Sequence, residues 1–349
     1  MTADLSEFHG ELRAAASGLL AGTPGWRAIA DAGWPGLEAP AAFDGADGTF
    51  AEVAVVLQEI GRAAAPGPYP SVAALAIGTL GLLSPGPGRD ELLRATVAGG
   101  TVPVVALDAE GTEAFRLTGG ARPDGARLHG AAAFVLDASA ADRVLVPAAD
   151  PDGTAVVADV DPADLTVEDR PVVDATRSLG RVAADGVAVR PESLHRFRVP
   201  DALERIRDRA AVAIACDCLG IAEAMLDATV AYTSDRRQFG RPVGSFQAVK
   251  HACADMLVRV TVTRELVAAA VRAQADGGPD AAAACSMAKS YACAAAVEVA
   301  GKAMQLHGGM GYTWESGVHV YLKRAALNRS LFGTPARHRA RLAVRYARR

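Results

Sequence analysis

Apolar residues recur with two different periods along this chain, and the change of period divides the sequence into three parts. In the first part, Val53, Val56, Leu57 and Ile60 follow the i, i+3, i+4, i+7 spacing of a helix with one buried face. Glycine and proline pairs separate such segments, so we predict helices over residues 5–20, 26–30, 50–64 and 72–83. Residues 1–99 therefore form a predicted N-terminal helical domain.

Short apolar runs cut by Asp, Gly and Pro follow between residues 100 and 200, and this pattern favours strands. The runs cover residues 104–107, 133–136, 143–147, 155–160 and 187–189. From residue 201 the helical period returns, through residues 203–233, 246–275, 281–306, 318–330 and 335–348. We predict an α+β multidomain fold, with a middle β domain over residues 100–200 and a C-terminal four-helix-type bundle over residues 201–349.

The composition indicates a globular protein that is large enough for several structural units. The chain has 349 residues, half of them hydrophobic, and a formal net charge of −4. Its basic residues are dispersed apart from the arginine-rich C-terminal end, so we expect no nucleic-acid partner. Neither a membrane-spanning run nor a signal-peptide pattern is present, so we expect a cytoplasmic protein without a membrane partner.

The cysteines and histidines do not form a recognisable metal-binding pattern. All five cysteines lie in predicted helices, where buried reduced thiols are expected. Cys216 and Cys218 are two residues apart on a helix and so point to different faces, which argues against a shared metal or a disulfide. No histidine pair has the helical spacing of metal ligands. We therefore predict no metal.

Two loops carry residues suited to a nucleotide. The first follows a predicted helix near Arg236, whose guanidinium can donate a fork of hydrogen bonds to a pyrophosphate. Phe239 offers an apolar face and Gln247 an amide for a flat heterocycle. An interhelical turn with a solvated arginine pair is the alternative interpretation. In the second loop, which begins at Gln305, glycines stand where backbone must approach another group closely.

Together, the two loops resemble the R-x-x-F-G and Q-x-x-G-G-x-G-[YF] motifs of the flavin-dependent acyl-CoA dehydrogenases, with matching internal spacing. The stretches 33–40 and 56–62 are also similar to the N-terminal domain of that family. The resemblance implies the helix, sheet, helix order, an FAD cofactor, an acyl-CoA thioester substrate and an electron-transfer flavoprotein partner. The residues that the resemblance assigns to FAD are Arg236, Gln238, Phe239, Gln247, Gln305, Gly308, Gly309 and Thr334.

The catalytic base of the family has no direct counterpart in this sequence. Counting without a gap from Gly309 places the glutamate of the family's Y-E-G-T motif at Phe332, which cannot accept a proton. Other relatives carry the glutamate on a bundle helix, at the position of Ala210 here. Asp217 lies seven residues further on the same helix face and is a candidate base. The alternative is a bundle aspartate that pairs with an arginine.

The family's flavin-binding sheet motifs, T-E-P-x-x-G-S-D and W-I-T, are also missing. Residues 106–111 and 134–136 stand in their place, and Leu136 replaces the threonine beside flavin N5. In the family's dimer, the two loops reach across to the neighbour's FAD, so this chain resembles a donor without a receiving half. The first hypothesis is therefore a heteromeric α2β2 subunit that resembles the chain without the catalytic glutamate and needs a second acyl-CoA dehydrogenase-like chain.

The second hypothesis is a self-sufficient dehydrogenase, a homo-oligomeric dimer or tetramer that acts on acyl-CoA or acyl-carrier-protein thioesters. This enzyme would require a relocated base such as Asp217. The acyl substrate is set by the shape of the pocket, which no single motif encodes.

Overall fold

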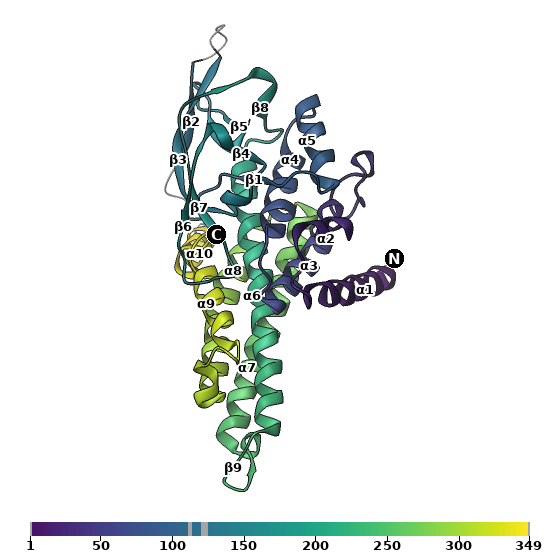
Figure 1. Ribbon diagram of the computed structural model, residues 1–349, viewed down its shortest axis with the longest axis vertical. Coiled ribbons are helices and arrows are strands. Elements are labelled where there is room, and N and C mark those ends of the chain that lie inside the picture. The colour runs from purple at the N-terminus through teal and green to yellow at the C-terminus, as the bar shows by residue number, and fades with distance from the viewer. Residues whose placement is uncertain (1, 111–113, 120–124, 348–349) are drawn as a thin grey trace.

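The computed structural model describes residues 2–110, 114–119 and 125–347 of the chain, and it consists of two helical units and a sheet (Figure 1). The N-terminal helices are α1 (Thr2–Leu20), α2 (Trp26–Asp31), α3 (Phe50–Ala63), α4 (Gly78–Leu82) and α5 (Pro87–Val97). The C-terminal helices are α6 (Ala202–Asp235), α7 (Gln247–Asp276), α8 (Ala281–Leu306), α9 (Val318–Asn328) and α10 (Pro335–Ala347). The predicted order of helical domain, β domain and helical bundle is confirmed.

The middle unit is one mixed sheet, with the strand order β6-β7-β3-β2-β4-β5-β8 and β1 paired in parallel with β4. Its strands are β1 (Pro103–Val105), β2 (Phe115–Thr118), β3 (Ala126–Leu136), β4 (Arg143–Ala149), β5 (Ala155–Val160), β6 (Thr166–Arg170), β7 (Leu179–Val189) and β8 (Leu194–Arg196). The long strands β3 and β7 are antiparallel and contain register shifts. These shifts bend the pair and leave the end of β3 facing the bundle.

Several elements of the N-terminal unit and the sheet differ from the prediction. The helix expected over residues 72–83 is a π-helical segment (Pro70–Ile77) that continues into α4. Helix α5 and the strands β2, β6 and β8 were not singled out from the sequence. They are short, and α5 lies within a stretch dense in Gly and Pro, where the apolar period is weak.

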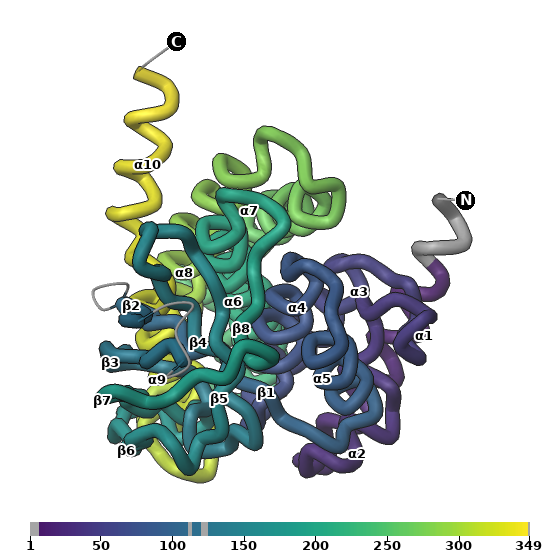
Figure 2. The backbone as a smooth tube through the Cα atoms, turned by 90° about the horizontal axis from the view of Figure 1, so that it is seen from above, coloured from purple at the N-terminus to yellow at the C-terminus, as the bar shows by residue number. Residues whose placement is uncertain are grey.

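Helix α6 is the central element because it is buried on almost every side from residue 208 to residue 223. It packs against α3 of the N-terminal unit and against α7 and α8 of the bundle, so the two helical units share one core. Beyond this core, α6 and α7 continue together to the narrow end of the molecule, away from the sheet (Figure 1). Helix α10 projects away from the body on another side (Figure 2).

The crossing of α3 and α6 depends on two glycines. A Cβ on Gly220 of α6 would collide with the Gln58 carbonyl and the Arg62 amide of α3. A Cβ on Gly61 of α3 would likewise collide with the backbone at Asp217. Only glycine lets these two helix backbones approach so closely.

We therefore expect Gly220→Ala to lower the free energy of unfolding by about 1–3 kcal/mol through overpacking. Gly18→Ala on α1 is the matched control, since a Cβ there meets no atom within 4 Å. That change should be neutral or stabilising by about 0.5–1 kcal/mol, because alanine favours helix over glycine. Urea unfolding of both variants measures the difference, and equal stabilities would contradict the close crossing.

Candidate functional site

The first predicted cofactor loop is a tight hairpin at the free end of α6 and α7. Helix α6 ends at Asp235, and the strands β9 (Arg237–Gln238) and β10 (Arg241–Pro242) pair in antiparallel register. Phe239 and Gly240 form the turn, both with positive φ. The sequence indicated a stiff loop here but not a β-hairpin. We call residues 236–247 the hairpin tip.

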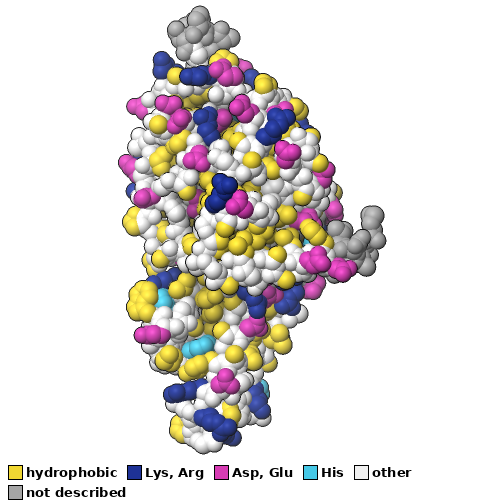
Figure 3. All heavy atoms as spheres, turned by 45° about the vertical axis from the view of Figure 1, so that its right-hand side comes forward, with side chains coloured by type: hydrophobic (Ala, Val, Ile, Leu, Met, Phe, Trp, Pro, Cys, Tyr) yellow, Lys and Arg dark blue, Asp and Glu magenta, His cyan; other side chains and the backbone are white. Residues whose placement is uncertain are grey.

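The second loop lies beside the hairpin tip. The rings of Tyr232, at the end of α6, and His307, at the end of α8, stack with a centroid distance of 4.4 Å. Gln305 lies in the last turn of α8, and the glycine-rich loop η8 (Gly308–Tyr312) follows. The structure thus brings both motifs to one end of the molecule, where Lys and Arg side chains gather on the surface (Figure 3).

At this end of the molecule, the residues predicted to contact the cofactor are exposed to solvent. The exposed residues are Arg236, Gln238, Phe239, Gln247, Gln305, Gly308 and Gly309. A Cβ on Gly308 or Gly309 would meet no atom within 4 Å, so the packing of the chain itself leaves the space beside these two residues open. Exposed guanidinium and amide groups beside accessible backbone fit a phosphate-bearing ligand that approaches from outside.

The eighth predicted contact, Thr334, lies elsewhere. It precedes α10, where its hydroxyl accepts a hydrogen bond from the Arg337 amide. His338 of α10 contacts Ser286 near the start of α8, whereas Gln305 lies near its end. At 1.5 Å per residue, these two positions of α8 are about 28 Å apart. The structure therefore divides the predicted cofactor residues between two distant places.

At the second place, the three positions that the resemblance matches to residues of the family's flavin site line one small cavity. Leu136 at the end of β3, Ala210 on α6 and Phe332 before α10 surround it together with Arg177 and Asp217. The cavity measures about 10 Å³, room for roughly one water molecule. Ligand pockets for molecules of flavin size are about 300–1,000 Å³. The side chains present therefore do not fit a flavin ring here.

Phe332 is fixed by hydrogen bonds from both sides. Its amide donates to the Ala109 carbonyl at 2.7 Å, and its carbonyl accepts from His338 Nε2 at 3.0 Å. Its φ of 54° lies in the left-handed region, a conformation that a bulky residue adopts only under tertiary constraint. Burial lowers the pKa of His338 to about 4, so the ring is neutral at pH 7. Phe332 is thus held against the sheet domain.

The loop that the resemblance matches to the family's pyrophosphate-binding motif, described here for residues 106–110 while residue 111 lies outside the described ranges, pairs its own backbone donors. The buried Asp108 carboxylate accepts hydrogen bonds from the amides of Glu110 and Ala133. These amides are therefore already paired within the chain. Within the described residues, the cavity at Leu136, Ala210 and Phe332 therefore lacks the space for a flavin ring, and these two backbone donors are not free.

Asp217, the candidate base, lies in a buried network of charges. Its carboxylate accepts hydrogen bonds from Arg324 at 2.6 Å and Asn328 at 2.6 Å and forms an ion pair with Arg177 at 3.0 Å. Burial alone would raise the pKa of Asp217, but the guanidiniums of Arg177 and Arg324 lower it to about 2. A general base works best with a pKa near the operating pH, so this geometry favours the alternative interpretation of a paired structural aspartate.

The cysteines of the chain lie in helices and form no disulfide among the described residues. The five cysteines are free thiols, and Cys218 faces Cys293 with 3.6 Å between the sulfur atoms. Four are buried, whereas Cys253 is half-buried.

Within the described residues, no three His, Cys, Asp or Glu side chains are grouped so as to hold a metal ion. No helix in the described ranges has the length and apolar character needed to cross a membrane.

The helix, sheet, helix order, with an arginine hairpin beside a glycine loop, defines a chain of the acyl-CoA dehydrogenase type. The family models "Acyl-CoA dehydrogenase, N-terminal domain" and "Acyl-CoA dehydrogenase, C-terminal domain" match residues 10–86 and 202–347. Acyl-CoA dehydrogenase IpdE2 of Mycolicibacterium smegmatis is 32% identical over 318 residues, 91% of this chain and 86% of that protein. The chain therefore belongs to the acyl-CoA dehydrogenase family, whose members are FAD-dependent oxidoreductases.

Further relatives include both single proteins and assemblies. Acyl-CoA dehydrogenase FadE34 of Mycobacterium tuberculosis is 33% identical over 305 residues, 86% of this chain but 39% of that protein. The structure titled "Tcur3481-Tcur3483 steroid ACAD G363A variant" has a TM-score of 0.87 at 28% identity, with 99% of both chains covered. The ChsE4-ChsE5 complex from Mycobacterium tuberculosis has a TM-score of 0.87 at 26% identity, with 97% of both chains covered.

Sequence reasoning missed Arg177 and Arg324, the two arginine partners of Asp217. Arg324 lies 107 residues from Asp217 in the sequence, so no local spacing connects them. The sequence around Asp217 does indicate that such a partner exists. An aspartate flanked by Ala, Cys and Leu in an apolar helical segment requires a buried positive partner.

We expect Asp217→Asn to lower the free energy of unfolding at pH 7 by on the order of 3–5 kcal/mol, because two buried guanidiniums lose their counter-ion. The folded pKa of Asp217 is depressed, so its stabilising contribution is present above the unfolded pKa and is lost as the pH falls toward about 2. The difference between wild type and variant should therefore shrink from pH 4 to pH 2 in urea unfolding.

The control is Asp227→Asn on the same helix, where an exposed carboxylate pairs with Arg62 and little stability should be lost. The base hypothesis makes the opposite prediction for Asp217→Asn, namely normal folding with dehydrogenation reduced by several orders of magnitude. Normal stability of the variant would rule out the structural assignment.

Proposed function

We propose that this chain is a subunit of a heteromeric acyl-CoA dehydrogenase that donates half of an FAD site to a second acyl-CoA dehydrogenase-like chain. A contrast between the hairpin tip and the cavity of Leu136 and Phe332 supports this proposal. The donated groups, such as Arg236 and Gln305, are exposed, whereas the cavity beside Leu136 and Phe332 is too small for a flavin ring.

In this assembly, the hairpin tip binds the adenosine-diphosphate end of an FAD whose ring the partner chain holds. Arg236 donates charge-assisted hydrogen bonds to the pyrophosphate, and the backbone at Gly308 and Gly309 approaches the cofactor closely. FAD supplies the hydride acceptor for α,β-dehydrogenation of an acyl-CoA thioester, and an electron-transfer flavoprotein reoxidises the assembly. The partner chain provides the glutamate that removes the α-proton.

Two of the similar proteins support a second chain. The Tcur3481-Tcur3483 and ChsE4-ChsE5 structures each name two components, and this chain covers nearly the whole of a chain in each. The match to FadE34 covers 39% of that protein, which leaves room for a second unit of similar size in the same polypeptide. The name of the first structure makes steroid-bearing acyl-CoA thioesters the first substrates to test.

A self-sufficient homo-oligomeric enzyme would need a different arrangement of the same residues. Phe332 and Arg177 would have to leave the cavity, and the ion pairs of Arg177 and Arg324 with Asp217 would have to break before this carboxylate could act as a base. Such a change exposes two buried guanidiniums without a counter-ion. No contact among the described residues favours that rearrangement.

We expect Arg236→Ala and Gln305→Ala to weaken FAD retention in the active assembly. The loss of a charge-assisted hydrogen bond costs about 1.5–3 kcal/mol, so the Arg236 variant should bind FAD roughly 10- to 150-fold more weakly. The Gln305 variant loses a neutral hydrogen bond and should show a smaller effect in the same direction. Fluorescence titration of the flavin-free assembly with FAD gives the dissociation constants.

Arg237→Ala is the matched control, because neighbouring residues of an extended chain point to opposite sides and Arg237 carries the same charge. This variant should retain FAD. Unchanged FAD affinity in both Arg236→Ala and Gln305→Ala would refute the assignment of the hairpin tip.

A further inference from the structure

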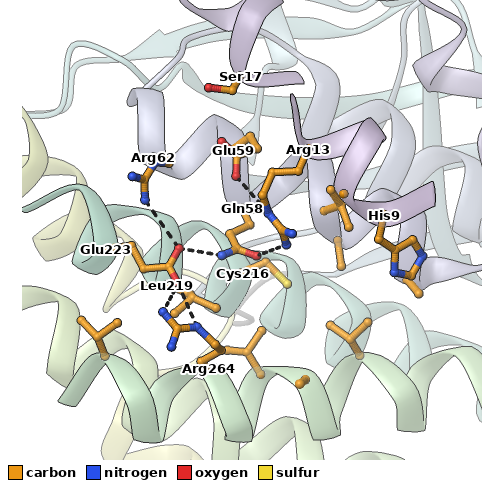
Figure 4. A pocket seen from close by; sticks show the side chains of 18 of the residues that line it. His9, Arg13, Ser17, Gln58, Glu59, Arg62, Cys216, Leu219, Glu223 and Arg264 are labelled. Atoms are coloured by element: carbon orange, nitrogen blue, oxygen red, sulfur yellow. Dashed lines mark hydrogen bonds and ion pairs between the residues drawn. The ribbon is translucent and has the colours of Figure 1, made fainter. Parts of the chain in front are cut away.

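A groove of about 1000 Å³ lies between α1 and α3 on one side and α7 on the other, with α6 as its floor (Figure 4). Its walls are mainly apolar, through residues such as Val55, Leu219, Val267 and Val271. It shares no described lining residue with the cavity of Leu136 and Phe332. A cleft of this size, with apolar walls and a few polar groups, is typical of a small-molecule site.

A band of polar side chains crosses the groove from α1 to α7 (Figure 4). Arg13 donates to the Gln58 amide oxygen at 3.3 Å, and the Gln58 amide nitrogen donates to Glu223 at 2.7 Å. On the other side, Arg264 donates to Glu223 at 2.7 Å. Because these groups come from four helices, the band marks a fixed polar position within an otherwise apolar groove.

Positive charge exceeds negative charge along the groove. The lining contains four arginines and three carboxylates, namely Arg13, Arg62, Arg264, Arg272, Glu59, Glu223 and Asp227. Burial raises the pKa of Glu59, whose described partner is Arg13 at 3.4 Å, so this carboxylate holds its negative charge less firmly than an exposed one. The groove is therefore suited to an anionic group more than to a cationic one.

The two guanidiniums at the ends of the band keep hydrogen-bond donors to spare. Arg13 uses its Nε and one Nη toward Glu59 and Gln58, and Arg264 uses its Nε and one Nη toward Glu223. A guanidinium carries five N–H groups, so the other Nη of each remains available among the described residues. Both side chains are about half exposed, at 46% and 50%, so a ligand can reach them.

From these contacts we propose that the groove binds an amphipathic carboxylate. Its apolar chain lies along the α3, α6 and α7 walls, and its carboxylate accepts hydrogen bonds from Arg13 and Arg264. The proposal does not depend on the heteromeric function, because the groove involves neither the hairpin tip nor the closed cavity. It gives this chain a lipid-type binding site distinct from both the hairpin tip and the cavity of Leu136 and Phe332.

The test is isothermal titration calorimetry of the full chain with dodecanoate and, as a charge control, with dodecyltrimethylammonium, both below their critical micelle concentrations. Dodecanoate should bind at one site per chain, at least about tenfold more tightly than the cation, since a charge-assisted hydrogen bond contributes roughly one such factor. Hydrogen exchange of the wild-type chain should show protection of residues 51–62 and 257–272 by dodecanoate.

Two variants with matched controls locate the site. Ala268→Trp should abolish dodecanoate binding by filling the groove, while Ala254→Trp, at an exposed position of α7 outside the groove, should not. Arg13→Gln should weaken binding about tenfold, while Arg27→Gln, in an exposed ion pair of α2, should leave it unchanged.

Equal affinity for anion and cation, or binding that survives Ala268→Trp, would show nonspecific adsorption and overturn the proposal. Absence of both binding and protection in the wild-type chain would overturn it as well. If the groove became protected only in an assembly with a second chain, it would be a protein interface instead.

Discussion

One buried carboxylate, Asp217, holds the three units of this protein together. Its main partner, Arg324, is fully buried and also donates to the Ala65 carbonyl of the N-terminal unit and the Thr176 hydroxyl of the sheet. Arg177, which follows Thr176, forms a second ion pair with the same carboxylate. Because a buried guanidinium without a counter-ion is very unfavourable, the N-terminal unit, the sheet and the bundle must meet at this point. The close crossing of α3 and α6 brings Asp217 there.

The same network limits the size of the cavity at which the resemblance places a flavin ring. Arg177 and Asp217 line the cavity at which Leu136, Ala210 and Phe332 meet, so the charges and the apolar side chains close it together. No comparable constraint acts at the hairpin tip, where the predicted cofactor groups need no partner within the chain. In the function proposed above, this chain therefore keeps the donated half of a shared site and lacks the receiving half. In the proposed assembly, the site is completed by a second chain.

Much of this architecture could be predicted from the sequence, because it depends on local patterns. The change of hydrophobic period marked the sheet, and counting from Gly309 and Arg236 placed Phe332 and Ala210, which the structure shows lining one cavity. What could not be predicted depends on contacts between distant residues. The arginine partners of Asp217 lie 40 and 107 residues away, and the groove beside α1 exists only because four helices assemble around it. No spacing of residues in the sequence distinguishes the β-hairpin at the tip from another stiff loop.

The flavin content of the chain, purified alone and after co-expression with a glutamate-bearing acyl-CoA dehydrogenase-like partner, tests the central claim most directly. Absorbance near 450 nm, normalised to protein, gives FAD per chain, and the Phe332→Glu variant serves as a control for a merely missing base. The account predicts almost no bound FAD in either form of the isolated chain, and about one FAD per pair of unlike chains in the assembly. Stoichiometric FAD with acyl-CoA turnover by the chain alone, mutated or not, would contradict it.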